Sequence, residues 1–304
     1  MHIAHNKVTR VLFFPFLFGV KWLGTIKPEL LVRIRYFVRF HRKLNLDAPQ
    51  TLNEKILYLS LRTDTEKWSQ LANKYSVREF VKNCGLEDIL IKIYAYWDNK
   101  NDINLDILPN SFVVKSVQGS GDVILVQDKR QIDHKVILRA MYSMLHNRYG
   151  ALEGGKHYLR INPAVIVEEL LSNSKGQSLI DYKIWCFNGK VYYIMTCSNR
   201  KSDSVCLGLY DKEWNYHPDY LVFSSEYTQE LEPLPKPKNL EIMFDVAEKL
   251  SKSFPCVRVD LYNINGKIYF GEMTFTSLGG LMNYYTDEFQ KKAGDIIDLN
   301  YGGE

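Results

Sequence analysis

Residues 255–280, PCVRVDLYNINGKIYFGEMTFTSLGG, hold two runs of alternating side chains on either side of Asn265-Gly266, and this pattern predicts a β-hairpin. The first strand is expected to turn apolar side chains to one face and polar ones to the other, namely Arg258, Asp260 and Tyr262. The second strand is expected to place four residues on one face: Ile268, Phe270, Glu272 and Thr274. A carboxylate among apolar neighbours requires a polar or charged partner.

The geometry of the turn decides which residues of the hairpin meet. A two-residue Asn-Gly loop pairs residue 264 with 267 and sends Asp260 and Glu272 to opposite faces. A three-residue loop with a left-handed Gly266 instead sets Arg258 opposite Glu272, with Asp260 diagonal to it. Two carboxylates with a cation between them suit Mg²⁺ shared with substrate phosphates, so a metal site requires the three-residue loop. The alternative is a structural salt bridge centred on Arg258.

Composition indicates a globular protein with an uneven charge distribution. The 304 residues are 46% hydrophobic and 13% aromatic, enough to bury the cores of two or three lobes. The net charge is +4, but residues 1–45 contain nine Lys/Arg and one acid, Glu29, which predicts an anionic partner for this segment. The five cysteines lack CxxC spacing, which argues against a disulfide framework and a zinc site and favours the cytoplasm.

The apolar run Val11 to Val20, VLFFPFLFGV, is too short to span a bilayer and contains Pro15. Two interpretations remain open for it, a plain amphipathic core helix, or a docking helix or element at a membrane surface. The second would give peripheral contact with the inner face of the membrane. Basic residues within this helical pattern match no nucleic-acid-binding module, so no nucleic-acid partner is expected.

Helical patterns follow up to residue 82. Thr51 and Glu54 form a capping-box signature, and a helix over 66–82 would carry Lys74 and Arg78 on one face. Such a pair of cations either faces an anion or belongs to a solvated basic surface. Further along the chain, Asn239 is predicted to cap a helix that leads into the hairpin.

A lysine and a glycine-rich loop lie between two predicted strands. Lys115 ends the strand 112–115, and Gly119-Ser120-Gly121 precedes the strand 123–126. Small residues let backbone N–H groups approach phosphates, although the loop is neither a Walker loop nor a Rossmann fingerprint. The strand 164–167 then runs into Glu168-Glu169-Leu170-Leu171, either a hinge for a purine edge or an ordinary strand end. A later strand, 180–187, places Asp181 and Lys183 on one face.

In order and spacing, six segments resemble the TupA-like ATP-grasp family over residues 44–287. They are TLNEKI (51–56), NKYSVREFV (73–81), LPNSFVVKSVQGSGDVILVQDK (108–129), IVEELL (166–171), LIDYKIWCFNGK (179–190) and FPCVRVDLYNINGKIYFGEMTFT (254–276). The resemblance implies an α+β ATP-grasp fold, in which two lobes clasp ATP, with a helical basic segment replacing the usual N-terminal sheet domain. The expected divisions are 1–73 for the helical region, 74–110 for a linker, 111–170 for the small lobe and 171–304 for the large lobe.

The resemblance also implies roles for individual residues, with ATP and Mg²⁺ as cofactors. Lys74 and Lys115 would bind nucleotide phosphates beneath a lid formed by Gly119, Ser120 and Gly121. The adenine hinge would include Glu168, Glu169 and Leu171, and Asp181 would hold the ribose. Arg258 would steady the transferred phosphoryl group, with Lys183 beside the site. The metal ligands would be Asp260, Glu272 and Thr274, the last at a position where asparagine is common.

The reaction implied by the resemblance is amide formation through an acyl-phosphate. The expected substrates are an amino acid or another amine, such as a short peptide, and a uronic acid of a capsular or O-antigen polysaccharide. Glycosyl transfer is the alternative, but the chain has no Asp-x-Asp motif for a nucleotide-sugar metal. Phosphoryl transfer needs positioning and charge neutralisation more than a nucleophilic side chain, which suits the charged residues of the hairpin.

Overall fold

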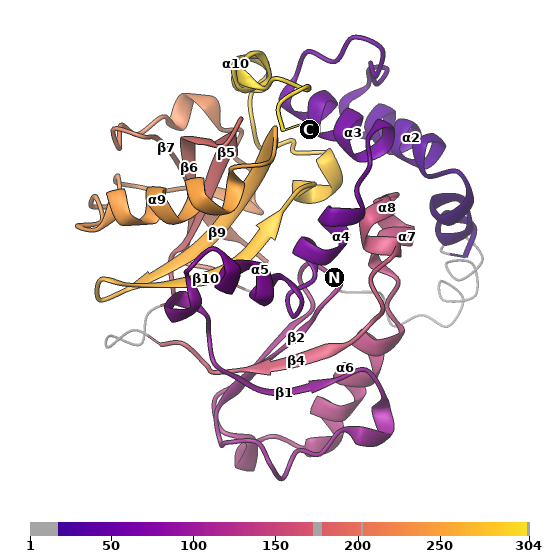
Figure 1. Ribbon diagram of the computed structural model, residues 1–304, viewed down its shortest axis with the longest axis vertical. Helices are drawn as coiled ribbons and strands as arrows, with labels where there is room; N and C mark the ends of the chain where they lie inside the picture. The colour runs from indigo at the N-terminus through magenta and orange to yellow at the C-terminus, as the bar shows by residue number, and fades with distance from the viewer. Residues whose placement is uncertain (1–17, 173–177, 202, 303–304) are drawn as a thin grey trace.

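The computed structural model describes residues 18–172, 178–201 and 203–302, and two β-sheets form its framework (Figure 1). Most of the apolar run 11–20 lies outside these residues. Among the helices described, none combines the length and apolar character needed to cross a bilayer. The expected α+β class is confirmed, because the chain forms two largely antiparallel sheets and has helices before, between and after their strands.

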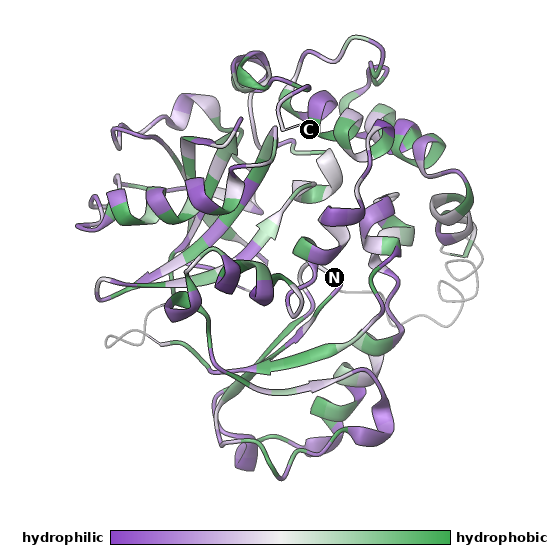
Figure 2. Ribbon diagram, in the orientation of Figure 1, coloured by the Kyte–Doolittle hydropathy of each residue, from purple (hydrophilic) through white to green (hydrophobic). Residues whose placement is uncertain are grey.

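The smaller sheet is antiparallel with the strand order β1-β4-β2-β3. Its strands are β1 (Ile93–Trp97), β2 (Phe112–Ser116), β3 (Val123–Val126) and β4 (Val165–Glu168). Strand β4 is largely apolar (Figure 2), and its Val165 and Val167 pack in one cluster with residues of helix α6 (His134–His146). The register places Lys115 and Glu168 on the face away from that cluster. Segment 74–110 supplies β1.

The larger sheet has the strand order β10-β9-β5-β6-β7-β8 and is antiparallel except where β8 joins β7. Its strands are β5 (Asp181–Phe187), β6 (Lys190–Ser198), β7 (Val205–Asp211), β8 (Tyr227–Gln229), β9 (Cys256–Ile264) and β10 (Lys267–Thr274). Helix α9 (Leu240–Ser251) packs against β9, β5 and β6 through buried apolar side chains such as Met243 and Leu250. The opposite face of these strands is therefore left for the polar side chains.

Helices make up the described part of the N-terminal region. Residues 18–26 are helical, followed by α2 (Pro28–Phe40), α3 (Leu52–Arg62), α4 (Glu66–Ala72) and α5 (Val77–Asn83). Three more helices lie later in the chain: α7 (Tyr149–Glu153), α8 (Lys156–Leu159) and α10 (Asp287–Ile296). The described residues also form 3-10 turns at Glu87–Ile89, Lys100–Asp102, Lys129–Gln131, Pro218–Tyr220 and Ser277–Gly280.

Two local signals at the helix ends had different outcomes. The capping box of Thr51 and Glu54 is confirmed at the start of α3. Asn239 precedes α9 but its side chain caps nothing, because its amide oxygen accepts from the side-chain nitrogen of Asn263 at 2.6 Å, while its amide nitrogen donates to the carbonyl of Gly266 at 2.9 Å. The helix expected over 66–82 is also interrupted at residues 73–76, where the Asn73 side chain accepts from the Tyr75 N–H and forms a turn. Lys74 therefore lies in a turn between α4 and α5.

The hairpin turn has two residues, so the expected three-residue loop is wrong. Ile264 pairs with Lys267, and both loop residues have positive φ, 53° for Asn265 and 86° for Gly266. This is the geometry that Asn-Gly favours, because its twist matches the right-handed twist of the two strands. By residue parity alone, such a turn would send Asp260 and Glu272 to opposite faces.

A β-bulge at Gly271 changes the register and brings the two carboxylates to the same face. Beyond the bulge Glu272 pairs with Asp260, and Thr274 rather than Glu272 pairs with Arg258. Before the bulge the side chains of β10 point the other way, so Ile268 and Phe270 do not share the face of Glu272 as expected. A Cβ on residue 271 would lie 2.9 Å from the carbonyl oxygen of Asp260, which explains why glycine occupies the bulge.

The bulge gives a prediction for stability. We expect Gly271→Ala to lower the free energy of unfolding by about 1–3 kcal/mol, because the added methyl group must displace the backbone of β9. Gly19→Ala is the control, since no atom lies within 4 Å of a Cβ added there and residue 19 is helical. Thermal and urea unfolding measure both variants. Equal stability of the two would show that the close approach at Gly271 has no energetic consequence.

Candidate active site

One face of the larger sheet carries a cluster of charged side chains from three adjacent strands. Strand β5 contributes Asp181 and Lys183, and the register sets Lys183 opposite Asp260 on β9. Strand β10 contributes Glu272, which the bulge sets on the other side of Asp260. Sequence positions about 80 residues apart are thereby brought together, and we call this group the charged cluster: Asp181, Lys183, Arg258, Asp260, Glu272 and Thr274.

Asp260 lies at the centre of the charged cluster and is only 2% exposed. Arg258 donates to both of its oxygens, from Nε at 2.7 Å and from Nη2 at 2.8 Å. The Nζ of Lys183 lies 2.5 Å from Asp260 and 2.6 Å from Asp181. Burial lowers the pKa of Lys183, but Asp181 and Asp260 outweigh burial and raise this pKa above its ordinary value. Lys183 is therefore a cation at neutral pH.

Further contacts fix the orientation of Arg258. Its guanidinium donates to the hydroxyls of Thr274 at 3.2 Å and Ser277 at 2.5 Å. The guanidinium carbon lies 5.8 Å from the ring centroid of Trp185, which bonds Tyr285 through its indole N–H. An arginine held on three sides keeps one orientation without a ligand, as the stabilisation of developing charge requires.

Glu272 is more open than Asp260, with a side chain 29% exposed. Its oxygens lie 3.3 Å from Lys74 and 3.7 Å from Arg258, and the hydroxyl of Thr274 donates to it at 3.1 Å. Burial raises the pKa of Glu272, but Lys74, Lys183 and Arg258 outweigh burial and lower it to about 2. Glu272 is therefore a partly exposed acceptor that stays ionised.

Lys74 connects the two sheets. Its Nζ donates to the carbonyl of Gly119 at 2.6 Å, and its backbone N–H donates to Val117 at 3.2 Å. The same Nζ contacts Glu272 on the larger sheet. The glycine-rich loop after β2 is thus tied to the charged cluster through one lysine. The phosphate-binding roles expected for Lys74 and for the loop stay predictions, but the structure does bring the lysine and the loop into contact.

Lys115 lies in a second group of charges on the smaller sheet. Its Nζ is 2.7 Å from Glu168, and Arg78 of α5 lies 4.0 Å from the other Glu168 oxygen. Glu168 is buried, whereas the neighbouring Glu169 is exposed and its backbone N–H donates to Lys92 at 2.9 Å. Leu171 follows β4 in an irregular, half-buried segment. In the glycine-rich loop, Gly121 has a φ of +83° and Ser120 is exposed.

Several residues near the charged cluster escaped the sequence analysis. Ser277 follows β10 and bonds both Arg258 and Tyr284, and its neighbours Leu278, Gly279 and Gly280 are all left-handed. The glycine pair after the second strand was the available signal for this turn. For Arg78 the sequence left two alternatives, an anion across from it or a solvated basic surface; its side chain is 19% exposed and faces Glu168.

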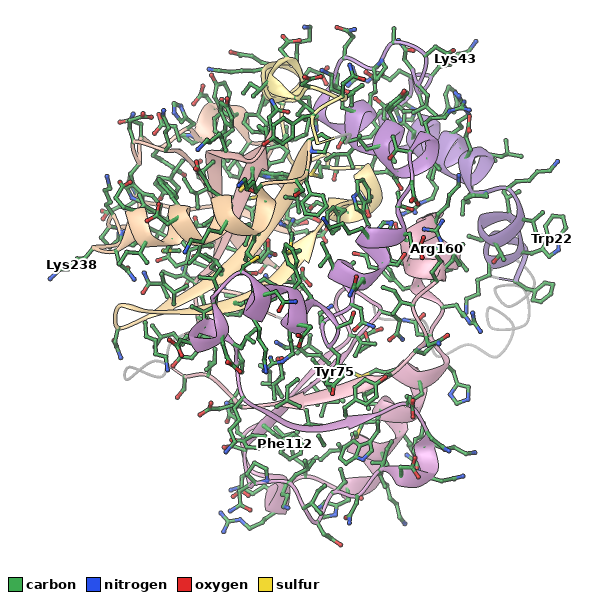
Figure 3. The ribbon with its side chains drawn as sticks, in the orientation of Figure 1. Trp22, Lys43, Tyr75, Phe112, Arg160 and Lys238 are labelled. Carbon is green, nitrogen blue, oxygen red and sulfur yellow. The ribbon has the colours of Figure 1, made fainter. Side chains whose placement is uncertain are left out.

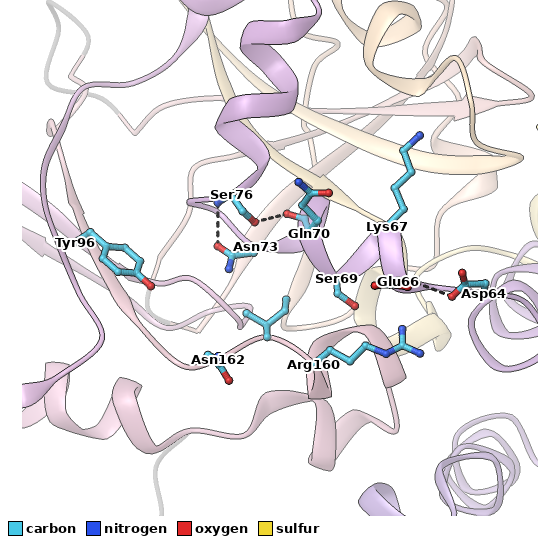
Figure 4. A pocket seen from close by; sticks show the side chains of 11 residues that line it. Asp64, Glu66, Lys67, Ser69, Gln70, Asn73, Ser76, Tyr96, Arg160 and Asn162 are labelled. Carbon is cyan, nitrogen blue, oxygen red and sulfur yellow. Dashed lines mark hydrogen bonds between the residues drawn. The ribbon is translucent and has the colours of Figure 1, made fainter.

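A separate pocket of about 760 Å³ lies beside α4 and residues 160–162 (Figure 4). Its wall is polar and includes the side chains of Gln70, Asn73, Tyr96 and Arg160. No member of the charged cluster lines it, although Asn73 adjoins Lys74 in the chain. This pocket is therefore a different place on the molecule from the charged cluster.

The oxygen donors of the charged cluster suit Mg²⁺. Within the described ranges, no three His, Cys, Asp or Glu residues are grouped as a metal site. Mg²⁺ in phosphoryl-transfer sites is commonly held by one or two carboxylates together with substrate phosphates. The partly exposed carboxylate of Glu272 and the Thr274 hydroxyl beside it fit that donor set, whereas both oxygens of Asp260 accept from Arg258 in this structure.

The lowered pKa of Glu272 predicts how stability changes in acid. The ordinary pKa of 4.5 falls to about 2 in the folded protein, so ionised Glu272 contributes stability above pH 4.5 that is lost as the pH falls towards 2. We expect Glu272→Gln to cost on the order of 2 kcal/mol at neutral pH and progressively less below pH 4.5. Urea unfolding across this pH range measures the difference.

Glu232→Gln is the matched control for this experiment, because Glu232 is exposed and forms no ion pair within the described residues. Its unfolding free energy should follow that of the unsubstituted protein at every pH. A deficit in Glu272→Gln that stays constant between neutral pH and pH 2 would contradict the ion-pairing account of Glu272.

Comparison with solved structures finds ligases of similar fold. D-alanine–D-alanine ligase from Bacillus anthracis, complexed with ATP, is 14% identical with a TM-score of 0.47, covering 79% of this chain and 65% of the ligase. The corresponding ligase from Helicobacter pylori is 16% identical with a TM-score of 0.46, covering 84% and 67%. L-amino acid ligase from Bacillus licheniformis is 15% identical with a TM-score of 0.44, covering 90% and 63%. This chain thus spans about two thirds of their length.

None of the curated proteins matches the chain. The model of the family described as TupA-like ATPgrasp matches residues 54–298, a range that contains both sheets and the whole charged cluster. The match covers most of the 304 residues and confirms the resemblance of the six sequence segments. The chain therefore belongs to the TupA-like ATP-grasp family.

Proposed function

We propose that this protein is an ATP-dependent carboxylate–amine ligase that forms an amide through an acyl-phosphate. The observation that carries the proposal is the double contact of Lys74, which joins the glycine-rich loop to Glu272 and hence to the charged cluster. A lysine from the turn between α4 and α5 thus meets a carboxylate of the larger sheet beside the glycine-rich loop of the smaller one. Cations and carboxylates in such proximity suit the binding of a nucleotide triphosphate with a divalent cation.

Lys74 and Lys115 would bind the phosphates of ATP by exchanging Glu272 and Glu168 for phosphate oxygens. The loop Gly119–Gly121 would cover these phosphates, since its small residues let backbone N–H groups approach. The segment Glu168–Leu171 would receive the adenine through backbone groups, and Asp181 at the start of β5 would accept from the ribose. In this proposal residues 111–170 act as the small lobe and residues 171–304 as the large lobe.

Asp260, Glu272 and Thr274 would hold Mg²⁺, which neutralises phosphate charge when it is bound. An oxygen of the substrate carboxylate attacks the γ-phosphorus, ADP leaves, and an acyl-phosphate remains. The amine then attacks the acyl carbon, phosphate leaves, and the amine nitrogen loses a proton. Arg258 would stabilise the negative charge on the transferred group, because Asp260 and Ser277 already fix its orientation. Lys183, which contacts Asp260, would add positive charge near the transferred phosphoryl group.

The substrates we propose are an amino acid or short peptide and a uronic acid of a capsular or O-antigen polysaccharide. Family membership and the resemblance of the six segments support this choice. The same proposal places the protein in the cytoplasm, where nucleotide sugars and lipid-linked units at the inner face of the membrane are accessible. Glycosyl transfer is the second candidate, although it has no support from an Asp-x-Asp motif in the sequence.

We expect Lys74→Ala and Lys115→Ala each to lower ATP turnover by about 100-fold or more, because each removes a cation from the developing phosphoryl charge. The measurement is release of ADP and phosphate across a panel of amino acids combined with UDP-linked uronic acids. Lys135→Ala, an exposed lysine of the same lobe, is the control and should be fully active.

Unfolding temperatures of the three variants separate lost chemistry from lost folding. A folded Lys115→Ala variant that kept near-full turnover would make Lys115 a structural partner of Glu168 only. Turnover of UDP-sugars without ATP consumption would favour glycosyl transfer and overturn the ligase proposal.

A further inference from the structure

The first two helices described carry large exposed apolar side chains at helical spacing. They recur every three or four residues along 18–26 and α2, and we call this set the apolar stripe: Phe18, Trp22, Ile26, Leu30, Ile34, Phe37 and Val38. Their exposed fractions range from 45% for Leu30 to 72% for Phe18. Trp22 points outward from the molecule (Figure 3). Exposed apolar residues are ordinary singly, but seven at helical spacing along two consecutive helices indicate an interaction surface.

Helix α2 is apolar on two opposite sides. Its inner side buries Leu31, Val32 and Tyr36, each 3–4% exposed, and the last two belong to the N-terminal helical core. Leu30, Ile34 and Phe37 lie on the other side in solvent. A helix that is hydrophobic all round normally has both sides covered. Among residues 18–172, 178–201 and 203–302, packing covers the inner side of α2 only, so the apolar stripe is left for a partner.

The charges beside the apolar stripe favour an anionic partner. Lys21, Lys27, Arg39 and Lys43 form no ion pair within the described residues. The one acid between residues 18 and 43 is Glu29, which is already paired with Arg33 and Arg62. A symmetric dimer through this face would bring its cations together, which opposes a second copy as the partner.

We propose that the apolar stripe binds the surface of an anionic lipid bilayer. The two helices would lie in the plane of the interface, with the stripe among the acyl chains and the lysines beside anionic headgroups. Residues 1–17 precede the stripe with Lys7, Arg10 and three phenylalanines and contain no acid, so the sequence there has the same chemical character. This inference goes beyond the ligase proposal and does not depend on it.

Vesicle flotation of the full chain tests the proposal. We expect binding to phosphatidylcholine vesicles containing about 30% phosphatidylglycerol, weaker binding to phosphatidylcholine alone, and release as salt rises from about 0.1 M to about 0.5 M. The triple substitution Trp22→Ser, Phe37→Ser and Val38→Ser should lower the partition coefficient by about tenfold or more. Because these side chains are 54–67% exposed, their loss should leave unfolding temperature and ATP turnover unchanged.

The matched control removes three other apolar side chains that are 57–63% exposed: Ile107→Ser, Leu125→Ser and Ile242→Ser. This variant should bind vesicles as the unsubstituted protein does. Failure of the unsubstituted protein to bind anionic vesicles, or equal loss in both triple variants, would overturn the proposal. A stripe-dependent dimer in solution without vesicle binding would overturn it in favour of a second copy.

Trp22 supplies an independent measurement of insertion. The other four tryptophans are buried or half-buried: Trp68, Trp97, Trp185 and Trp214. Brominated lipids should therefore quench the fluorescence of Trp22 alone, and Trp22→Phe should abolish quenching while vesicle binding persists. Quenching that survives in Trp22→Phe would place the membrane contact elsewhere and overturn the assignment to the apolar stripe.

Discussion

The buried contact of Arg258 with Asp260 is the interaction on which the candidate site depends. Each charge would be costly to bury alone, and each is stabilised by the other and by further polar contacts. Because Lys183 also contacts Asp260, the same carboxylate links strands β5 and β9, and Arg258 extends the contacts to Glu272 on β10. Removing one member would leave the others buried without a partner. The same contacts therefore stabilise the sheet and fix the orientation of the side chains in the candidate site.

The bulge at Gly271 makes this arrangement compatible with the Asn-Gly turn. The tight turn satisfies the twist of the strands, but on its own it would separate the two carboxylates. One extra residue in β10 restores their common face within four residues of the strand end. The turn thereby keeps its preferred two-residue geometry, and Asp260 and Glu272 still share one face. The irregular pairing is confined to Gly271, which has no side chain to clash with β9.

Lys74 has the corresponding role between the sheets. It lies in a turn that interrupts a predicted helix, and the interruption is what allows its side chain to reach both Gly119 and Glu272. The contact is electrostatic on one side and a hydrogen bond on the other, so an incoming anion competes with both partners. The loop and the charged cluster are therefore coupled through a group that also suits phosphate binding.

The sequence by itself determined the features that depend on neighbouring residues. Alternation predicted strands β2, β5 and β9 to within a residue or two, the capping box predicted the start of α3, and six spaced segments identified the family. The residues of the charged cluster were also singled out from the sequence, since polar residues within apolar strands stand out in a linear pattern, and the structure brings them together. What the sequence could not determine was which side chains would pair.

Only the tertiary structure decided those pairings, because they depend on atoms from distant parts of the chain. Asp260 opposes Glu272 through a bulge that forms against the backbone of β9, and Arg258 consequently opposes Thr274. The side-chain oxygen of Asn239 accepts from Asn263 rather than capping α9, since the hairpin lies within reach of its side chain. Periodicity along a chain records which face a residue prefers, whereas register and ion pairing are set by the packing of segments that meet only after folding.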